Sequence, residues 1–158
     1  MRRCAICNKI WFNLTSPVCE DCYNETKIKV NNLYEEIKYL EELLDKDYLR
    51  IVQYLSKYKK LLKLYKELYF YADIFPKEIE IEPRTYNEFI NLVNENISDL
   101  ANHRIDVYYI QIEKMGDMTC VVELKILENE LLKAQQKYPE FKESLNTTRI
   151  ENILSKYE

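Results

Sequence analysis

The sequence is very poor in glycine and histidine, and this scarcity excludes many classes of catalytic and nucleotide-binding site. Its 158 residues include one glycine and one histidine, His103. Phosphate-binding loops, dinucleotide-binding turns and nucleophile elbows need several glycines, because their backbones turn tightly or approach the ligand closely. A single histidine also excludes the histidine-rich metal sites of hydrolases and oxygenases. We therefore expect a protein that is not an enzyme.

Long apolar runs and a strong net charge are missing as well. No apolar run approaches the length of roughly 18 residues that a membrane span needs, and no apolar segment follows the basic N-terminal pair, as it would in a signal peptide. The formal net charge is −4, so bulk electrostatics gives no reason to expect nucleic-acid binding. We expect an intracellular protein in a reducing compartment. The abundance of tyrosine and lysine is typical of an AT-rich genome and suits a viral or phage protein.

The cysteines, by contrast, are concentrated in the first 22 residues, in the pattern Cys4-x2-Cys7-x11-Cys19-x2-Cys22. Two ligands three positions apart can bind one metal across a tight turn, and two such turns complete a tetrahedral thiolate site. In a reducing compartment clustered cysteines bind metal more often than they form disulfides, and redox Cys-x-x-Cys motifs normally occur singly. Four sulfurs favour zinc, with iron as the alternative. Asn8 follows the first pair, where a residue that tolerates positive φ is needed.

The finger carries a limited family resemblance. The stretch CNKIWF, followed by VCEDCYNE and a helix, resembles small C4 zinc-ribbon or treble-clef fingers, including the N-terminal finger of flagellar-operon zinc proteins. The resemblance covers about 20 residues and carries over only the four cysteines as metal ligands. It implies binding to nucleic acid or protein rather than catalysis.

The longest feature of the body is a heptad pattern over residues 24–72, which contain no proline or glycine. Apolar positions recur in alternating steps of three and four, as in a helix with one buried seam. The seam comprises Leu33, Ile37, Leu40, Leu44, Ile51, Tyr54, Tyr58, Leu61, Tyr65, Leu68 and Ala72. The register survives across Asp45-Lys46-Asp47, which favours one long helix. The alternative is a tight turn at these residues, with Asp47 capping a second helix, so that residues 24–72 form a helical hairpin.

The remaining sequence predicts a connector and three further helices. The segment PKEIEIEP lies between prolines in the connector 73–84 and reads as an extended connector or a short edge strand. Helices are expected over 85–115, 119–138 and 148–157, although residues 105–113 fit a strand as well. Gly116 and Asp117 suit a helix end and the cap of the next helix, so an antiparallel hairpin should turn there. The prediction is an all-α fold, divided into a finger of residues 1–23 and a helical body of residues 24–158.

Two surfaces are candidates for partner contact. The first is the finger, with Arg2, Arg3, Lys9 and Trp11, although Trp11 and Phe12 could instead form its small core. The second is a helical face with Lys59, Lys63 and Lys66 at i, i+4 and i+7. This face could follow a phosphate backbone, but in a lysine-rich chain a solvated face is the simpler interpretation, and the interleaved tyrosines on the seam are expected to be core.

The function that we predict is non-enzymatic binding. The chain is expected to be a regulatory or accessory protein that docks on a larger nucleic-acid-handling machine, such as transcription apparatus, through a protein partner, with nucleic acid as the second choice. The alternative is a structural or assembly protein that uses the long heptad helix as an oligomerisation rod, for example in a homodimer. Cys120 is expected to be a buried core cysteine rather than a nucleophile paired with His103.

Overall fold

A computed structural model describes residues 2–11, 17–45, 49–83 and 85–157. The elements along the chain are β1 (Arg2–Arg3), β2 (Ile10–Trp11), α1 (Glu20–Leu44), α2 (Ile51–Ile74), α3 (Tyr86–Met115), α4 (Thr119–Lys137), the 3-10 helix η1 (Pro139–Leu145) and α5 (Thr148–Leu154). The predicted helical fold is therefore confirmed. None of the described helices is long and apolar enough to cross a membrane.

The chain packs as two compact units, and they are not consecutive in sequence. Unit 1 comprises Met1–Lys46 and Lys60–Tyr86, and unit 2 comprises Asp47–Lys59 and Asn87–Glu158. Helix α2 contributes its first part to unit 2 and the remainder to unit 1. The predicted division into residues 1–23 and 24–158 stays a prediction, because these units describe packing and not whether the finger folds by itself.

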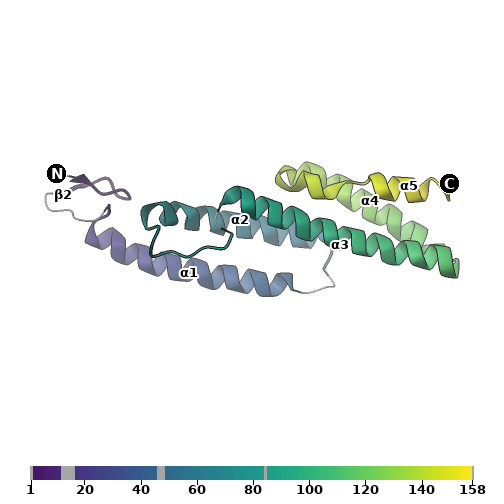
Figure 1. Cartoon of the computed structure of the whole chain (residues 1–158), viewed down its shortest axis with the longest axis horizontal. Helices are drawn as coiled ribbons and strands as arrows, with labels where there is room; N and C mark the ends of the chain where they lie inside the picture. Colours follow the sequence, from purple (N-terminus) through teal and green to yellow (C-terminus); the bar gives the residue numbers. More distant parts are fainter. Residues whose placement is uncertain (1, 12–16, 46–48, 84, 158) are drawn as a thin grey trace. The chain divides into compact units, whose positions relative to one another are not determined.

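The single helix that we predicted over residues 24–72 is wrong, because α1 ends at Leu44 and α2 begins at Ile51. Asp45 is the C-terminal cap of α1, and residues 46–48, including the proposed cap Asp47, lie outside the described residues. In unit 1, α1 packs antiparallel to the second part of α2 (Figure 1). Tyr65 donates a hydrogen bond to Glu41, whereas the ring of Tyr23 contacts that of Phe75, so the two segments run in opposite directions.

Most seam residues are buried on both helices of this hairpin, and the exceptions lie near its ends. Leu33 and Ile37 of α1 and Leu61, Tyr65 and Leu68 of α2 are buried, as the heptad pattern predicts. Leu40 and Leu44 are only half-buried. Burial of large apolar side chains is the main favourable term in such a pairing. The heptad pattern therefore identifies the face that is buried, although the helix that covers it belongs to the same chain.

The connector after α2 lies against the hairpin and is held there by tyrosine hydroxyl groups. Tyr34 donates to the carbonyl of Glu80 over 3.0 Å. The single hydroxyl hydrogen of Tyr65 is shared between the carboxylate of Glu41 at 3.0 Å and the carbonyl of Glu82 at 3.1 Å. Tyr69 donates to the carbonyl of Pro83 over 2.7 Å. Residues 76–78 form a turn, and the described part of the connector contains no strand. The connector is thus held in place by hydrogen bonds to side chains of α1 and α2.

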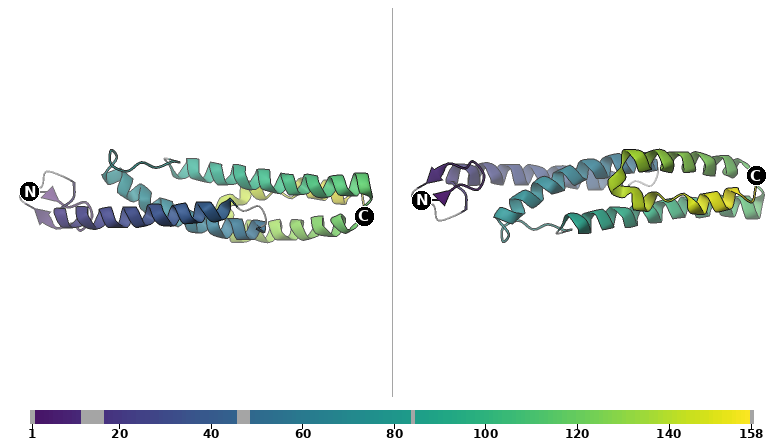
Figure 2. Two further views of the ribbon diagram at one scale, coloured as in Figure 1. Left: turned by 90° about the horizontal axis from the view of Figure 1, so that it is seen from below. Right: turned by 90° about the horizontal axis from the view of Figure 1, so that it is seen from above.

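Unit 2 is a helical assembly built around α3 and α4. These helices lie side by side with α5 in both views of Figure 2. Arg149 of α5 bonds to Asn102 and Asp106, and Lys156 bonds to Tyr109, so α5 runs parallel to α3. Residues 105–113, which fitted a strand or a helix, are helical. The core includes the fully buried side chains Phe89, Ile97, Ile105, Leu124, Leu131, Phe141, Leu145 and Ile150.

The turn between α3 and α4 uses the single glycine. Gly116 adopts a φ of +64°, and its N–H donates to the carbonyl of Ile112, which is the bonding pattern of a left-handed helix cap. The next residue, Asp117, accepts hydrogen bonds from the backbone N–H of Thr119 at 3.1 Å and from its hydroxyl at 2.5 Å. These bonds lower the pKa of Asp117. The predicted role of Gly116 at the helix end is confirmed, whereas the N-terminal cap residue of α4 is Met118 and Asp117 lies one position before it.

Candidate metal centre

The first cysteine pair lies on the loop between two short antiparallel strands. Arg2 pairs with Trp11 and Arg3 with Ile10, and the intervening loop carries Cys4 and Cys7. The backbone N–H of Asn8 donates to the carbonyl of Cys4 over 3.0 Å, which closes a tight turn around the pair. Asn8 has a φ of 61°, as we expected from its position after Cys7. The local sequence therefore favours a loop conformation in which the side chains of Cys4 and Cys7 face one point.

The second pair lies at the beginning of α1. Cys19 is the N-terminal cap residue, with φ −72° and ψ 162°, and Cys22 follows in the first turn. The N–H of Tyr23 donates to the carbonyl of Cys19 over 2.9 Å. The helix thus begins at Glu20, before the position that we predicted, and places both thiols at its positive end.

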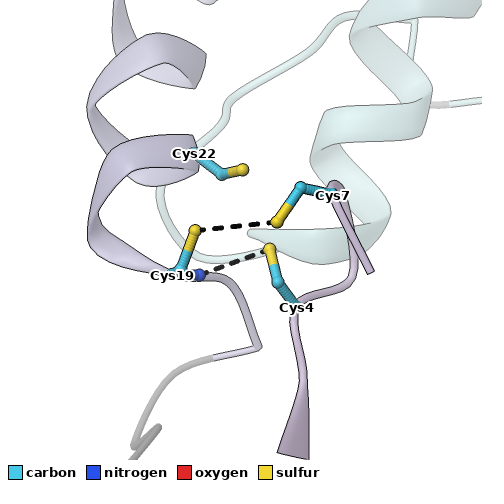
Figure 3. A group of neighbouring side chains, drawn as sticks. All are labelled: Cys4, Cys7, Cys19 and Cys22. Carbon is cyan, nitrogen blue, oxygen red and sulfur yellow. Dashed lines mark hydrogen bonds between the residues drawn. The ribbon is translucent and has the colours of Figure 1, made fainter. Parts of the chain in front are cut away.

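The four thiols converge on one point. The Sγ atoms of Cys4, Cys7, Cys19 and Cys22 all lie within 4.8 Å of one another. Figure 3 shows the pairs facing each other from the loop and from the helix, with the Sγ atoms of Cys7 and Cys19 3.9 Å apart. A tetrahedral zinc site with Zn–S bonds of about 2.3 Å requires sulfur separations of about 3.8 Å. The donor set and its spacing therefore fit a zinc ion, and the predicted clustering of the four cysteines is confirmed.

The surroundings of the cluster change the acidity of two of its thiols. Burial raises the pKa of Cys4, but backbone N–H groups of Cys19, Cys7 and Ile6 outweigh this effect and lower its pKa below the ordinary value. The N–H of Cys19 donates to the Sγ of Cys4 over 3.4 Å. Burial and contact with the other three cysteines raise the pKa of Cys22. Several thiolates cannot be held this close together without a cation, so a bound metal would remove the repulsion between them.

Phe75 packs against the cysteine cluster, and the sequence analysis did not predict this contribution. A buried group unites Cys4, Cys19 and Cys22 with Val18 and Phe75, which lies just beyond the end of α2. Ile6, Tyr23, Ile74 and Ile79 pack around this group. Phe75 is the next seam position after Ala72, one step of three further on, so extending the heptad pattern to Pro76 would have found it. The candidate metal centre is therefore continuous with the core of the helical hairpin.

The basic residues predicted on the finger are exposed. Arg2, Arg3 and Lys9 all lie at its surface, and the guanidinium of Arg3 donates to the carbonyl of Asn8 over 3.1 Å. Ile10, on β2, is 49% exposed. The side chain of Trp11 and the whole of Phe12 lie outside the described residues, so their predicted roles stay predictions.

The lysines predicted on α2 are partly engaged by other side chains. Lys59 forms an ion pair of 2.9 Å with Glu140. Lys66 lies 5.2 Å from the centre of the Tyr86 ring, and Lys63 is exposed. Tyr58 and Tyr65, on the neighbouring seam, are buried as expected. These contacts favour the interpretation of a solvated lysine face.

Cys120 is a buried residue of unit 2. It is 4% exposed, and its thiol donates to the amide oxygen of Gln111 over 2.9 Å. Burial, followed by the charge of Asp117, raises its pKa. A raised pKa keeps the thiol protonated, whereas a nucleophilic cysteine needs the thiolate. His103 is exposed on α3.

Comparison with known proteins gives no relative for this chain. No protein-family model, no curated protein and no solved structure matches it. The resemblance of the first residues to small zinc-ribbon fingers therefore assigns no family, and the function has to be argued from the site itself.

Proposed function

We propose that this chain is a zinc-binding regulatory or accessory protein, without catalytic activity, that docks on a larger nucleic-acid-handling machine such as transcription apparatus. The finger is the proposed docking element, and the partner is proposed to be a protein. An origin in a virus or phage would suit such a role. The observation that carries the proposal is the convergence of four cysteine thiols at the beginning of α1.

The type of site supports a structural role for the metal. Catalytic zinc sites keep one coordination position for water or substrate, whereas four thiolates occupy every position of a tetrahedral ion. Zinc bound here would cross-link the loop of Cys4 and Cys7 to the helix that begins after Cys19. A segment this small buries too little surface to be stable by itself, and metal binding supplies the missing free energy.

The surface of the finger supports docking. Arg2, Arg3 and Lys9 place three exposed cations on an element fixed at one end by the metal centre. The chain as a whole carries a net charge of −4, so this basic surface is a local feature. Because few cations are gathered there and no continuous basic stripe follows them, we favour an acidic protein surface over a phosphate backbone as the partner.

The two separate helices do not favour the alternative function, a structural or assembly protein. A structural protein that oligomerises through a long rod requires one continuous heptad helix, but the chain is helical over Glu20–Leu44 and Ile51–Ile74 separately. Most of the seam residues on each helix are buried within unit 1 or unit 2, which leaves little of the seam for a second copy of the chain. We therefore do not propose a homodimer through this seam.

Affinity purification of the tagged full chain from host cells tests the proposal. We expect subunits of a nucleic-acid-handling machine to copurify, to remain after nuclease treatment, and to be lost in the triple variant Arg2→Glu, Arg3→Glu, Lys9→Glu. The matched control reverses the charge of three exposed lysines on α3 and α4, namely Lys114→Glu, Lys125→Glu and Lys133→Glu, so that the net charge changes by the same amount. Equal loss in both variants would show that net charge, and not the finger, holds the partner.

A second experiment decides between a protein and a nucleic acid as the partner. Binding of the wild-type chain to single-stranded and double-stranded DNA and RNA is measured at low and high salt. If the partner is a protein, we expect no retention tighter than the micromolar range at low salt. Retention that falls steeply with salt and disappears in Lys59→Ala, Lys63→Ala, Lys66→Ala would overturn the preference for a protein, because lysines bound to phosphates produce that salt dependence.

A further inference from the structure

Unit 1 contains two neighbouring cavities along its connector, and both are lined by Tyr34. The first has a volume of about 310 Å³ and lies between α1, Phe75 and the first connector residues. The second, of about 250 Å³, lies between α1, α2 and the last connector residues, and it includes Glu80 and Glu82 in its lining. Both cavities lie along the connector and share this tyrosine, and together we call them the connector groove.

The first cavity offers an apolar seat. Val30, Phe75 and Ile79 supply its aliphatic and aromatic lining, and Tyr23 and Tyr34 stand beside them. Its volume lies at the small end of the range for ligand-binding pockets, which runs from roughly 300 to 1,000 Å³. A cavity of this size and lining fits one large apolar side chain of a partner better than it fits a whole cofactor.

Carboxylates outnumber lysines in the lining of the connector groove as a whole. Four glutamates and two lysines line the two cavities, namely Glu41, Glu78, Glu80, Glu82, Lys27 and Lys38. Burial raises the pKa of Tyr34; the hydrogen bond to the carbonyl of Glu80 opposes this rise, and the charge of Glu80 adds a smaller one. Burial, followed by the charge of Glu41, raises the pKa of Tyr65. A partner that enters this groove should therefore carry positive charge.

The wall of the groove is held in place before any partner arrives. The hydroxyl groups of Tyr34 and Tyr65 contact the carbonyls of Glu80 and Glu82 and so hold the connector against α1 and α2. Tyr23 donates to the carboxylate of Glu78 over 3.4 Å at the other end. A fixed surface binds with a smaller loss of conformational entropy than a mobile one.

We propose that the connector groove binds an extended basic segment of a partner protein, with one apolar side chain seated against Val30, Phe75 and Ile79 and lysine or arginine side chains beside Glu80 and Glu82. The juxtaposition of one apolar cavity with a carboxylate-lined cavity, joined at Tyr34, carries this assignment. It does not depend on the finger contacting a nucleic-acid-handling machine, because the groove lies on the hairpin and its connector.

Selection of a phage-displayed library of random dodecapeptides on the immobilised full chain tests the assignment. We expect the enriched peptides to combine one large aliphatic or aromatic residue with lysine or arginine close to it. The best peptide is then synthesised with a fluorescent label, and its affinity is measured by anisotropy. Failure to enrich any peptide, or enrichment of acidic or uncharged peptides, would overturn the proposal.

Two variants with the same change in charge locate the binding site. Glu80→Lys with Glu82→Lys should weaken binding of the selected peptide about tenfold, since charges at the rim of an interface contribute modestly but reversal makes each contact repulsive. The matched control, Glu25→Lys with Glu36→Lys, changes exposed residues on the opposite flank of α1 and should leave the affinity within about twofold of the wild type. Equal weakening by the two variants would contradict a site in the groove.

A third variant tests the apolar seat without changing a carboxylate. Asn31 is exposed at the edge of the first cavity, so Asn31→Trp places a large ring over the opening at little cost to the fold. We expect this variant to lose binding of the peptide while it retains the circular dichroism spectrum and metal content of the wild type. Unchanged binding would show that the first cavity is not the seat.

Discussion

Tyr23 and Phe75 meet edge to face, with ring centroids 5.6 Å apart and an angle of 70° between the rings. One ring follows the last cysteine of the candidate metal centre, and the other lies just beyond α2. Edge-to-face aromatic pairs stabilise by about 0.5–1.5 kcal/mol beyond the area that they bury. The pair joins the beginning of the hairpin to its end, so the residues that pack around the metal centre also hold the two helices of the hairpin together.

The first prediction concerns metal content. Purified protein should contain one zinc per chain, and Cys4→Ser or Cys22→Ser should lose it, because each removes one of four thiolates from the tetrahedral set. Cys120→Ser is the matched control and should retain the zinc, since Cys120 lies in unit 2 and bonds to Gln111. Mass spectrometry with inductively coupled plasma measures the stoichiometry. Iron in place of zinc, or a wild type without metal, would contradict the prediction.

The second prediction concerns the consequences of metal removal. Chelation should loosen unit 1 where it packs on the cluster, namely the first turns of α1 and residues 71–79, because Phe75 and Tyr23 lose the surface that they cover. Helices α3 to α5 should retain their protection, since they belong to unit 2. Hydrogen exchange with mass spectrometry resolves these segments. Loss of protection throughout α3 and α4 would mean that the two units do not unfold separately.

The third prediction compares two phenylalanines at the end of α2. Phe75 is 8% exposed, and Phe70 is 51% exposed. Phe75→Ala should lower the free energy of unfolding of unit 1 by about 3 kcal/mol, the usual cost of deleting a buried aromatic ring, and should also speed zinc release to a chelator. Phe70→Ala should cost less than about 1 kcal/mol. Denaturant unfolding and a zinc-sensitive dye measure the two effects, and equal behaviour of the variants would refute the role of Phe75.

The fourth prediction tests the seam of the hairpin. Leu61 is 3% exposed, so Leu61→Asp buries an unpaired carboxylate and should cost several kcal/mol or unfold unit 1. Leu40 is only half-buried near the turn, and Leu40→Asp should cost distinctly less because water still reaches the carboxylate. The midpoints of thermal unfolding, followed by circular dichroism, give the order of the two variants. A greater loss for Leu40→Asp would show that the hairpin is packed differently.

The candidate metal centre was largely predictable because its determinants are local. The spacing of the four cysteines, the tolerance of Asn8 for positive φ and the helix after Cys19 all act within about 20 residues. The same is true of Gly116, whose left-handed conformation ends α3. Phe75 was missed because its contact with Cys22 joins residues far apart in sequence, and spacing alone does not indicate which buried positions meet.

The break between α1 and α2 was not predictable from the seam. Leu44 and Ile51 are seven positions apart, so a continuous helix and a hairpin both keep the seam in register. Hydrophobic periodicity shows which face of a helix is buried, but not whether the covering surface comes from another chain or from the same one. Contacts such as the hydrogen bond between Tyr65 and Glu41 distinguish a hairpin from a continuous helix, and they form only after the chain has turned back.

The interleaving of the two units along the chain has a consequence for how the protein is made. Lys60–Tyr86 of unit 1 interrupts the sequence of unit 2, whose parts are Asp47–Lys59 and Asn87–Glu158. During synthesis, unit 1 has all of its residues once Tyr86 has left the ribosome, whereas the first part of α2 must wait for α3 to α5 before its apolar face is covered. A nascent chain that ends near Tyr86 should therefore still expose Ile51, Tyr54 and Leu55, which are buried in the complete protein. Capture by chaperones should be most frequent at this point of synthesis.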